Sequence, residues 1–281
     1  LKIPGFSDGG GEFAIRVRFE ETGIWRVSIG ATPNDPDLAS RFALEVTPSS
    51  ARGQLRITAP TQTSSATTGQ RARAVRLAFG DGTPFFHAGD TCYPLLALDR
   101  ATQLLPYLDR RAAQGFSHIR FQCARGAVNP WGGKRGEPDL DRFNPAFFAH
   151  LDRVMRDLRA RKLGAEMILL SYYSVDGPMS NPRLWTPERE HAWLSYLVAR
   201  YSAFDNIVYW TLANEFETYP DGKYRIDDGD SVWARRTAGV VKALDPYRHL
   251  VTVHPFMGYA EYLADFGRAP EIDLLMFQEH G

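Results

Sequence analysis

The chain has 281 residues, of which 44% are hydrophobic and 23% charged, a composition typical of a globular protein with a sizeable core. Its 33 Lys and Arg residues balance its 33 Asp and Glu residues, and this formal net charge of zero argues against a nucleic-acid partner. No apolar run approaches the roughly 20 residues that span a bilayer, and the amino terminus lacks an initiator Met and a signal-peptide core. We therefore expect a processed or trimmed chain with no membrane and no nucleic-acid partner.

Residues 1–60 read as β structure. Residues 12–19 alternate apolar and polar side chains with a period of two, which predicts a half-buried strand. Further strands are predicted at 24–29 and 42–46, and antiparallel strands joined by short turns indicate a partial β-sandwich domain. Residues 61–73 are small, polar and free of aromatic side chains, so we interpret them as a linker.

From residue 74 to residue 281 the pattern changes to alternating strands and helices. Gly80-Asp81-Gly82 predicts a hairpin turn that leads into the first strand. Near-continuous apolar strands separated by helices are typical of a parallel sheet covered by helices. Six such strands precede residue 281, whereas a (β/α)8 TIM-type barrel needs eight, so the barrel is incomplete or the sheet is an open, doubly wound one. The predicted strands are 83–88, 117–124, 165–172, 206–213, 250–254 and 272–277, and the predicted helices are 101–114, 145–162, 187–201, 231–244 and 259–266.

Ionisable and aromatic side chains gather at the predicted carboxyl ends of these strands, where barrel enzymes place their chemistry. We expect some of them to bind a substrate through hydrogen bonds, salt bridges or stacking; the alternatives are turn capping for Asp90, a buried ion pair for Arg120 and core packing for Tyr172 and Trp210. The candidates in chain order are Asp90, Arg120, Tyr172, Trp210, Asn214, Glu215, His254, Glu279 and His280.

Glu215 is the strongest catalytic candidate. The apolar strand 207–213 leads into Asn214 and then Glu215. Retaining glycosidases need a carboxylic acid that protonates the leaving oxygen and a second carboxylate about 5 to 5.5 Å away as the nucleophile. Such an acid must hold its proton near neutral pH, which apolar neighbours such as Trp210 and Phe216 favour. Two alternatives stay open: a non-catalytic carbohydrate-binding barrel, and a lyase or isomerase that uses Glu215 as a base.

The chain resembles the clan A glycoside hydrolases, and more narrowly the apiosidase-like barrel family, whose members often carry an amino-terminal β-sandwich of uncharacterised role. The resemblance rests on residues 82–91, 210–215, 254–255 and 277–281, with 6–10, 16–19 and 22–25 resembling the end of the sandwich. It implies a retaining O-glycoside hydrolase that needs no cofactor, acts on a plant or algal polysaccharide or oligosaccharide, and is secreted or periplasmic. Apiosidases themselves tend to carry an Asp at the position of Glu215, so the resemblance favours clan A chemistry over an apiose substrate.

The resemblance also implies that the nucleophile is a Glu at the end of a seventh strand, which we expect beyond residue 281. Within this chain Glu279, at the end of the sixth strand, is the carboxylate that could take this role; otherwise it lines the cleft. We predict no metal site, because Asp227-Asp228-Gly229-Asp230 lacks the spacing of a calcium loop and the cysteines and histidines lack zinc-ligand spacing. Cys92 and Cys123 lie on predicted neighbouring strands, where a disulfide would fit, but two free thiols are favoured.

Overall fold

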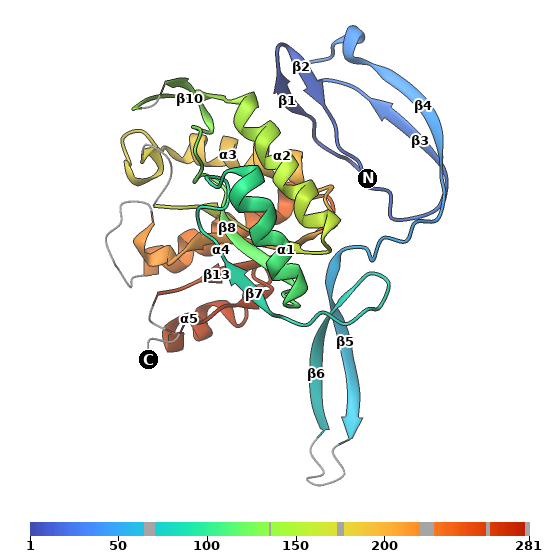
Figure 1. Cartoon of the computed structure of the whole chain (residues 1–281), viewed down its shortest axis with the longest axis vertical. Helices are drawn as coiled ribbons and strands as arrows, with labels where there is room; N and C mark the ends of the chain where they lie inside the picture. Colours follow the sequence, from blue (N-terminus) through green and yellow to red (C-terminus); the bar gives the residue numbers. More distant parts are fainter. Residues whose placement is uncertain (65–70, 135, 173–176, 220–227, 257–258, 279–281) are drawn as a thin grey trace.

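The computed structural model describes residues 1–281 except 65–70, 135, 173–176, 220–227, 257–258 and 279–281. Six parallel strands form one sheet in the order β14-β13-β12-β11-β8-β7. Figure 1 labels β7, β8 and β13 of this sheet. The predicted number and alternation of the strands are confirmed, but the first strand lies at 89–91 and not at 83–88, where Pro84 makes an isolated bridge to Ala78. The strands are β7 (Gly89–Thr91), β8 (His118–Gln122), β11 (Gly164–Leu170), β12 (Ile207–Asn214), β13 (Leu250–His254) and β14 (Leu274–Leu275).

Helices cover the outer face of this sheet. Capping residues start two of them: Asn144 accepts a hydrogen bond from Ala146 N at the start of α2, and Thr186 accepts one from Arg189 N at the start of α3. Each cap is followed by a proline in the first turn, which suits a helix start because its missing N–H would have no partner there. The helices are α1 (Leu105–Ala113), which follows a π-helical turn (Arg100–Leu104), α2 (Pro145–Ala160), α3 (Pro187–Tyr201), α4 (Asp228–Leu244) and α5 (Tyr259–Phe266).

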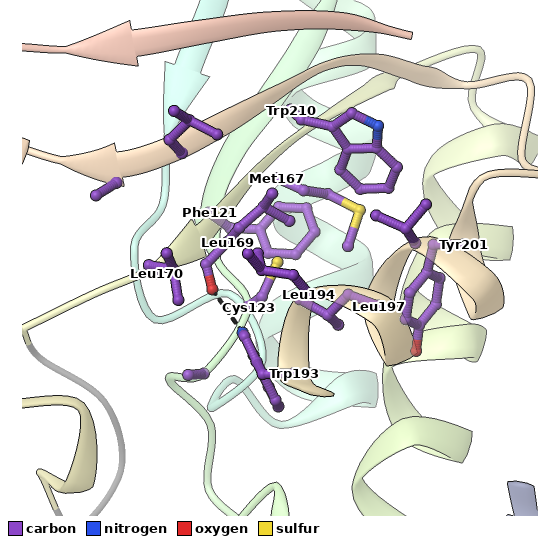
Figure 2. Close-up of a cluster of buried hydrophobic side chains, with 14 of the residues drawn as sticks. Phe121, Cys123, Met167, Leu169, Leu170, Trp193, Leu194, Leu197, Tyr201 and Trp210 are labelled. Atoms are coloured by element: carbon purple, nitrogen blue, oxygen red, sulfur yellow. Dashed lines mark hydrogen bonds between the residues drawn. The ribbon is translucent and has the colours of Figure 1, made fainter. Parts of the chain in front are cut away.

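The packing between the outer face and α3 forms part of the main core (Figure 2). Phe121, Met167 and Trp210 come from three neighbouring strands and are fully buried together with Trp193 of α3. The Trp193 indole N–H donates to the carbonyl of Leu169 over 2.8 Å, so the largest helix side chain also satisfies its one polar group. Every residue of β8, β11, β12 and β13 is buried, as is typical of parallel strands covered on both faces, although β8 alternates the polar residues His118, Arg120 and Gln122 with apolar ones.

The amino-terminal region forms three antiparallel hairpins in the described residues. They pair β1 (Phe6–Gly9) with β2 (Glu12–Ala14), β3 (Gly23–Ile29) with β4 (Ser40–Val46), and β5 (Leu55–Ser64) with β6 (Arg71–Phe79). Two packed sheets do not occur among the residues described, so the β-sandwich stays a prediction. The strands β5 and β6 extend into residues 61–73, which we had interpreted as a linker, because pairing satisfies their backbone groups.

Several short elements differ from the expected pattern. The hairpin of β9 (Trp131–Lys134) and β10 (Glu137–Phe143) was not predicted. Two 3-10 turns, Pro36–Leu38 and Pro178–Ser180, also interrupt segments read as loops. None of these elements changes the order of the parallel strands.

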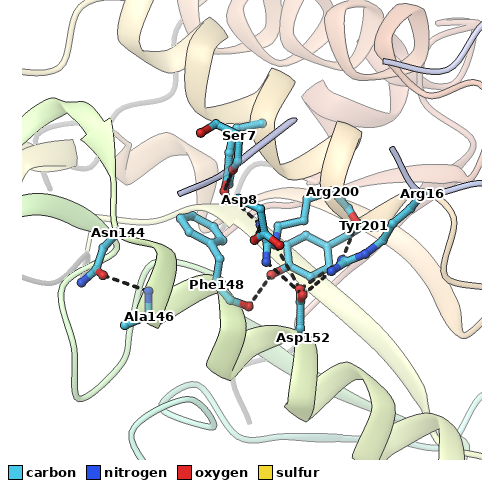
Figure 3. Close-up of polar contacts among 10 residues, drawn as sticks. Ser7, Asp8, Arg16, Asn144, Ala146, Phe148, Asp152, Arg200 and Tyr201 are labelled. Atoms are coloured by element: carbon cyan, nitrogen blue, oxygen red, sulfur yellow. Dashed lines mark hydrogen bonds and ion pairs between the residues drawn. The ribbon is translucent and has the colours of Figure 1, made fainter. Parts of the chain in front are cut away.

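The segment after β2 docks onto the helices through charged side chains (Figure 3). Arg16 pairs with Asp152 of α2 and donates to the carbonyl of Arg200 in α3 over 2.8 Å. Arg200 is itself bound to Asp152 at 2.9 Å and to Asp8 at 2.7 Å, and its side chain is 1% exposed. The strand predicted over 12–19 ends at Ala14. Beyond it the side chain of Arg16 contacts α2 and α3, while Ile15 is exposed.

The β5–β6 hairpin closes the amino-terminal edge of the sheet before projecting away from the body (Figure 1). Leu55 packs with Val208, Tyr209 and Leu250 in a second, smaller hydrophobic cluster. Phe85 joins this cluster, and its backbone N–H donates to the carbonyl of Leu77 over 2.9 Å. Apolar side chains fill this edge of the sheet. The polar side chains that could bind or react with a substrate are therefore expected at the opposite edge, at the carboxyl ends of the strands.

Candidate active site

Glu215 follows the last residue of β12 in a left-handed backbone conformation, with φ of +50° and ψ of +62°. This conformation costs about 1 to 2 kcal/mol in a residue with a Cβ atom. Hydrogen bonds within the next turn hold it: the Glu215 carbonyl accepts from Thr218 N at 2.8 Å and from Thr218 Oγ1 at 2.7 Å. Strained backbone of this kind concentrates at functional sites, and here it directs one carboxyl group away from the regular strand.

Groups from two neighbouring strands meet Glu215. Gln278, just beyond β14, donates from Nε2 to Glu215 Oε1 over 3.3 Å. His254, the last residue of β13, accepts at Nδ1 from the backbone N–H of Glu215 over 3.3 Å. The ends of β12, β13 and β14 thus converge on one carboxyl group, as expected for the carboxyl edge of a parallel sheet.

His254 is a neutral side chain with a defined proton position. It is 3% exposed, and burial together with the nearby positive charge of Arg120 lowers its pKa to about 3. Because Nδ1 accepts a hydrogen bond, the proton of the neutral ring lies on Nε2. His254 therefore offers an N–H donor, which suits a hydroxyl or carboxylate ligand.

Asn214 has one end of its amide fixed. Its Oδ1 accepts hydrogen bonds from Tyr93 Oη at 3.0 Å and from Arg120 Nη2 at 2.8 Å. Two donors on the same atom identify it as the oxygen, so the NH2 group is the end of the amide that can donate to a ligand. Arg120, for which a ligand-orienting role and a buried ion pair were both open, makes a buried ion pair with Glu166 at 2.9 Å.

Glu166 lies on the inner face of the sheet, below the edge that carries Glu215. Besides Arg120 it accepts from Thr211 Oγ1 at 2.8 Å and from Tyr209 Oη at 3.2 Å. Burial alone would raise its pKa, but His118, Arg120 and Thr211 together lower it, so the carboxylate is ionised. We did not select this residue from the sequence, although a charged side chain inside an otherwise apolar strand was a usable signal.

Two predicted binding residues have partners within the protein, and for Trp210 this corrects the sequence interpretation. Trp210 is fully buried on the outer face, where its indole N–H donates to Asp245 over 2.9 Å, so it cannot stack on a sugar. The Asp90 carboxylate is bound by Arg111 and by Tyr107 Oη of α1, the latter at 2.8 Å, and its side chain is 25% exposed, so its binding of sugar hydroxyls stays a prediction. Burial would raise the pKa of Asp90, but these two partners lower it.

The other predicted residues are placed only in part. Tyr172 lies two residues beyond the end of β11, half-buried, at the same edge as Glu215. Glu279 and His280 lie outside the described residues. Sequence reasoning overlooked Tyr93 and Gln278, which contact Asn214 and Glu215 from segments that follow β7 and β14.

Cys92 and Cys123 are both free thiols, as favoured from the sequence. Cys123 is completely buried, and burial raises the pKa of its thiol. Among the described residues no three His, Cys, Asp or Glu side chains cluster as metal ligands would. In that same part of the chain, every helix is too short or too polar to cross a membrane.

Comparison with known proteins identifies the family. The model of the catalytic domain of the apiosidase-like family matches residues 73–281. The chain belongs to this family. No curated protein matches the chain.

Solved structures share the fold. One is a protein from Bacteroides vulgatus provisionally described as a glycoside hydrolase, with 23% identity and a TM-score of 0.73 over 98% of this chain and 52% of that one. The endo-1,4-beta-mannanase from Rhizomucor miehei has 15% identity and a TM-score of 0.56 over 73% of this chain and 70% of its own. An exo-beta-1,4-mannosidase from an Opitutaceae bacterium has 19% identity and a TM-score of 0.52, over 70% and 39%. This chain thus spans about half the length of the Bacteroides protein, and the half-barrel sheet has the TIM-type fold.

Proposed function

We propose that the protein is a retaining O-glycoside hydrolase in which Glu215 is the general acid/base. The observation that carries the proposal is the position of Glu215: a carboxyl group at the end of the fourth parallel strand, held in a strained conformation and contacted by Gln278. Membership of the apiosidase-like family supports this chemistry.

In the first step Glu215 would donate its proton to the glycosidic oxygen while a second carboxylate attacks the anomeric carbon and forms a glycosyl-enzyme. In the second step Glu215 would take a proton from water, which hydrolyses the intermediate and restores both carboxyl groups. The family resemblance implies that the second carboxylate is a Glu at the end of a seventh strand. Glu279 is the candidate within this chain.

The neighbours of Glu215 suit the binding of a neutral sugar. The NH2 group of Asn214 and the Nε2–H of His254 are donors that can hold hydroxyl oxygens near the reacting bond. Their orientations are fixed by other contacts before any ligand arrives, so little entropy is lost on binding. Tyr172 and, outside the described residues, His280 are further candidates for this role.

For the substrate we propose a plant or algal polysaccharide or oligosaccharide, which would place the protein outside the cytoplasm, secreted or periplasmic. Beta-mannans are the first substrates to test, since two proteins with a similar fold are named for acting on beta-1,4-mannosidic linkages. A panel of aryl glycosides and polysaccharides would then define the sugar and the linkage.

The test is the variant Glu215→Gln, with Glu45→Gln as the matched control because Glu45 is an exposed carboxylate on β4, outside the parallel sheet. We expect Glu215→Gln to fold and to lose turnover of glycosides with poor leaving groups by about 100-fold or more, and to lose less with activated aryl glycosides. Full activity of Glu215→Gln on poorly activated glycosides would refute the assignment. Sugar binding by the wild type without any turnover would instead favour a non-catalytic carbohydrate-binding barrel.

A further inference from the structure

A column of polar side chains runs along the inner face of the sheet beneath Glu215, with Glu166 at its centre. One carboxylate oxygen of Glu166 meets Thr211 Oγ1 at 2.8 Å and Arg120 Nε at 2.9 Å, and the other meets Tyr209 Oη at 3.2 Å. Glu166 is 2% exposed, so it cannot touch a substrate. Whatever it does for the site, it does through its neighbours.

Protein stability alone does not explain why Glu166 and Arg120 form a buried ion pair. Removing two ions from water costs several kcal/mol each, and replacement of a buried ion pair by well-packed apolar side chains is often neutral or stabilising. The surrounding backbone is nevertheless shaped to fit the column. A Cβ atom on Gly89 would lie 2.3 Å from Nε2 of His118, the ring that approaches Glu166 at 3.5 Å, so only glycine is compatible with this arrangement.

Arg120 connects this buried carboxylate to the candidate site. Its Nε faces Glu166, and its Nη2 donates to Asn214 Oδ1 over 2.8 Å. Asn214 is adjacent to Glu215 in sequence and pairs with His254 across the sheet. A displacement of Arg120 would therefore remove one of the two donors to Asn214 Oδ1 and leave only Tyr93, and a loss of the carboxylate would leave the charge of Arg120 unbalanced beside His254 and Asn214, the neighbours of Glu215.

We propose that Glu166 is a positioning residue for glycoside hydrolysis: it fixes Arg120, and through it Asn214, and its charge balances Arg120 below the catalytic acid. This inference rests on the proposed function. In the described residues the charged and titratable groups facing Glu166 are Arg120 and His118 of β8, Tyr209 of β12 and His254 of β13, with His87 bound to Tyr209 at 2.7 Å. Those placed around Glu215 in the described residues are His254 of β13, Arg120 through Asn214, and Tyr172 beyond β11.

Two variants separate the charge of Glu166 from its contacts. Glu166→Gln keeps the shape and removes the charge, so the unbalanced Arg120 favours the ionised form of Glu215. We then expect the basic limb of the profile of kcat/KM against pH to move to lower pH by on the order of one unit. Glu166→Asp keeps the charge but withdraws the carboxylate by one methylene group. We expect its pH limb to stay in place while kcat falls by about tenfold, because Asn214 then keeps only the hydrogen bond from Tyr93.

Hydrogen exchange at Arg120 Nη2–H, which donates to Asn214 Oδ1 over 2.8 Å, provides a readout that does not need turnover. NMR of arginine side chains can follow this proton, with its signal assigned by its loss in Arg120→Lys. In Glu166→Asp we expect exchange at least tenfold faster than in the wild type. Thr211→Val is the matched control, because it removes one hydrogen bond to Glu166 and leaves both its charge and its contact with Arg120; its pH limb and its exchange rate should match the wild type.

An unchanged pH limb in folded Glu166→Gln, or wild-type kcat and exchange in Glu166→Asp, would overturn the inference. If Glu166→Gln does not fold, the Glu166→Asp measurements decide alone. If the wild type turns over no glycoside, the proposed function fails. The exchange rates would then still show whether Glu166 fixes Arg120.

Discussion

The backbone N–H of Glu215 donates a hydrogen bond to Nδ1 of His254 across the neighbouring strands β12 and β13, over 3.3 Å. This contact joins the candidate acid to a ring that burial keeps neutral. It also fixes the tautomer of His254, since an acceptor at Nδ1 leaves the proton on Nε2. One hydrogen bond thus sets both the backbone at Glu215 and the donor that His254 can offer.

The low pKa of His254 predicts a loss of stability in mild acid. Its pKa is about 3 in the folded protein and near 6.5 when unfolded, so between these values the unfolded chain binds a proton that the folded chain does not. Stability contributed by the neutral ring is therefore complete above pH 6.5 and falls as the pH drops towards 3, by about 1.4 kcal/mol per pH unit. The measurement is urea unfolding of the wild type and of His254→Asn at pH 6.5 and pH 5.

Between these two pH values the wild type should lose about 2 kcal/mol more than His254→Asn. The exposed His191 provides the control, since His191→Asn should follow the wild type. Equal pH slopes for the wild type and His254→Asn would show that His254 is not buried as a neutral ring.

The left-handed backbone at Glu215 predicts an unusual order of stability among its variants. Glycine adopts φ of +50° without steric cost, whereas alanine retains the Cβ atom and the strain. The free energy of unfolding of Glu215→Gly should therefore be about 1 kcal/mol higher than that of Glu215→Ala. Glycine would be the more stable variant here, although it destabilises most ordered positions. Thermal and urea unfolding of the two variants test this, and a less stable glycine variant would contradict the strained geometry.

The sequence predicted positions along the strands better than it predicted the faces to which side chains point. Asn214, Glu215 and His254 were found because apolar runs end just before them. The prediction for Trp210 was wrong because this side chain lies on the face of β12 that packs against helices. The register of β12 shifts between Thr211 and Asn214, so alternation of side chains between the two faces does not extend to the strand end.

Contacts between residues far apart in the chain also could not be predicted from the sequence. Alternation over 12–19 predicted Ile15 and Val17 on the buried face, but both are exposed. Arg16 instead contacts α3, and the guanidinium of Arg18 lies over the ring of Tyr247. Likewise the role of Glu166 depends on partners in other strands, and no local pattern identifies them. Periodicity finds elements, whereas ion pairs between distant elements decide which face of an irregular segment is buried.

The contact between Trp210 and Asp245 predicts a structural rather than a sugar-binding role for this tryptophan. Burial would raise the pKa of Asp245, but His249 and the Trp210 indole lower it to about 2. Trp210→Phe removes one donor to this carboxylate and opens a small cavity, so we expect a loss of about 2 kcal/mol in the free energy of unfolding. With any substrate that the wild type turns over, KM should change less than twofold; a large rise in KM at unchanged stability would restore the stacking role.

The buried cluster that docks the amino-terminal segment predicts strong coupling between that segment and the helices. Asp152 accepts from both Arg16 and Arg200, so Asp152→Ala would leave two arginines without their shared partner, one of them completely buried. We expect a loss of about 3 to 5 kcal/mol in the free energy of unfolding, together with faster proteolysis before residue 20. Arg189→Ala is the control, because its ion pair with Asp141 is largely exposed and should contribute about 1 kcal/mol or less. If Asp152→Ala costs no more than Arg189→Ala and its amino-terminal segment resists protease as the wild type does, the segment is held by its apolar contacts and not by this cluster.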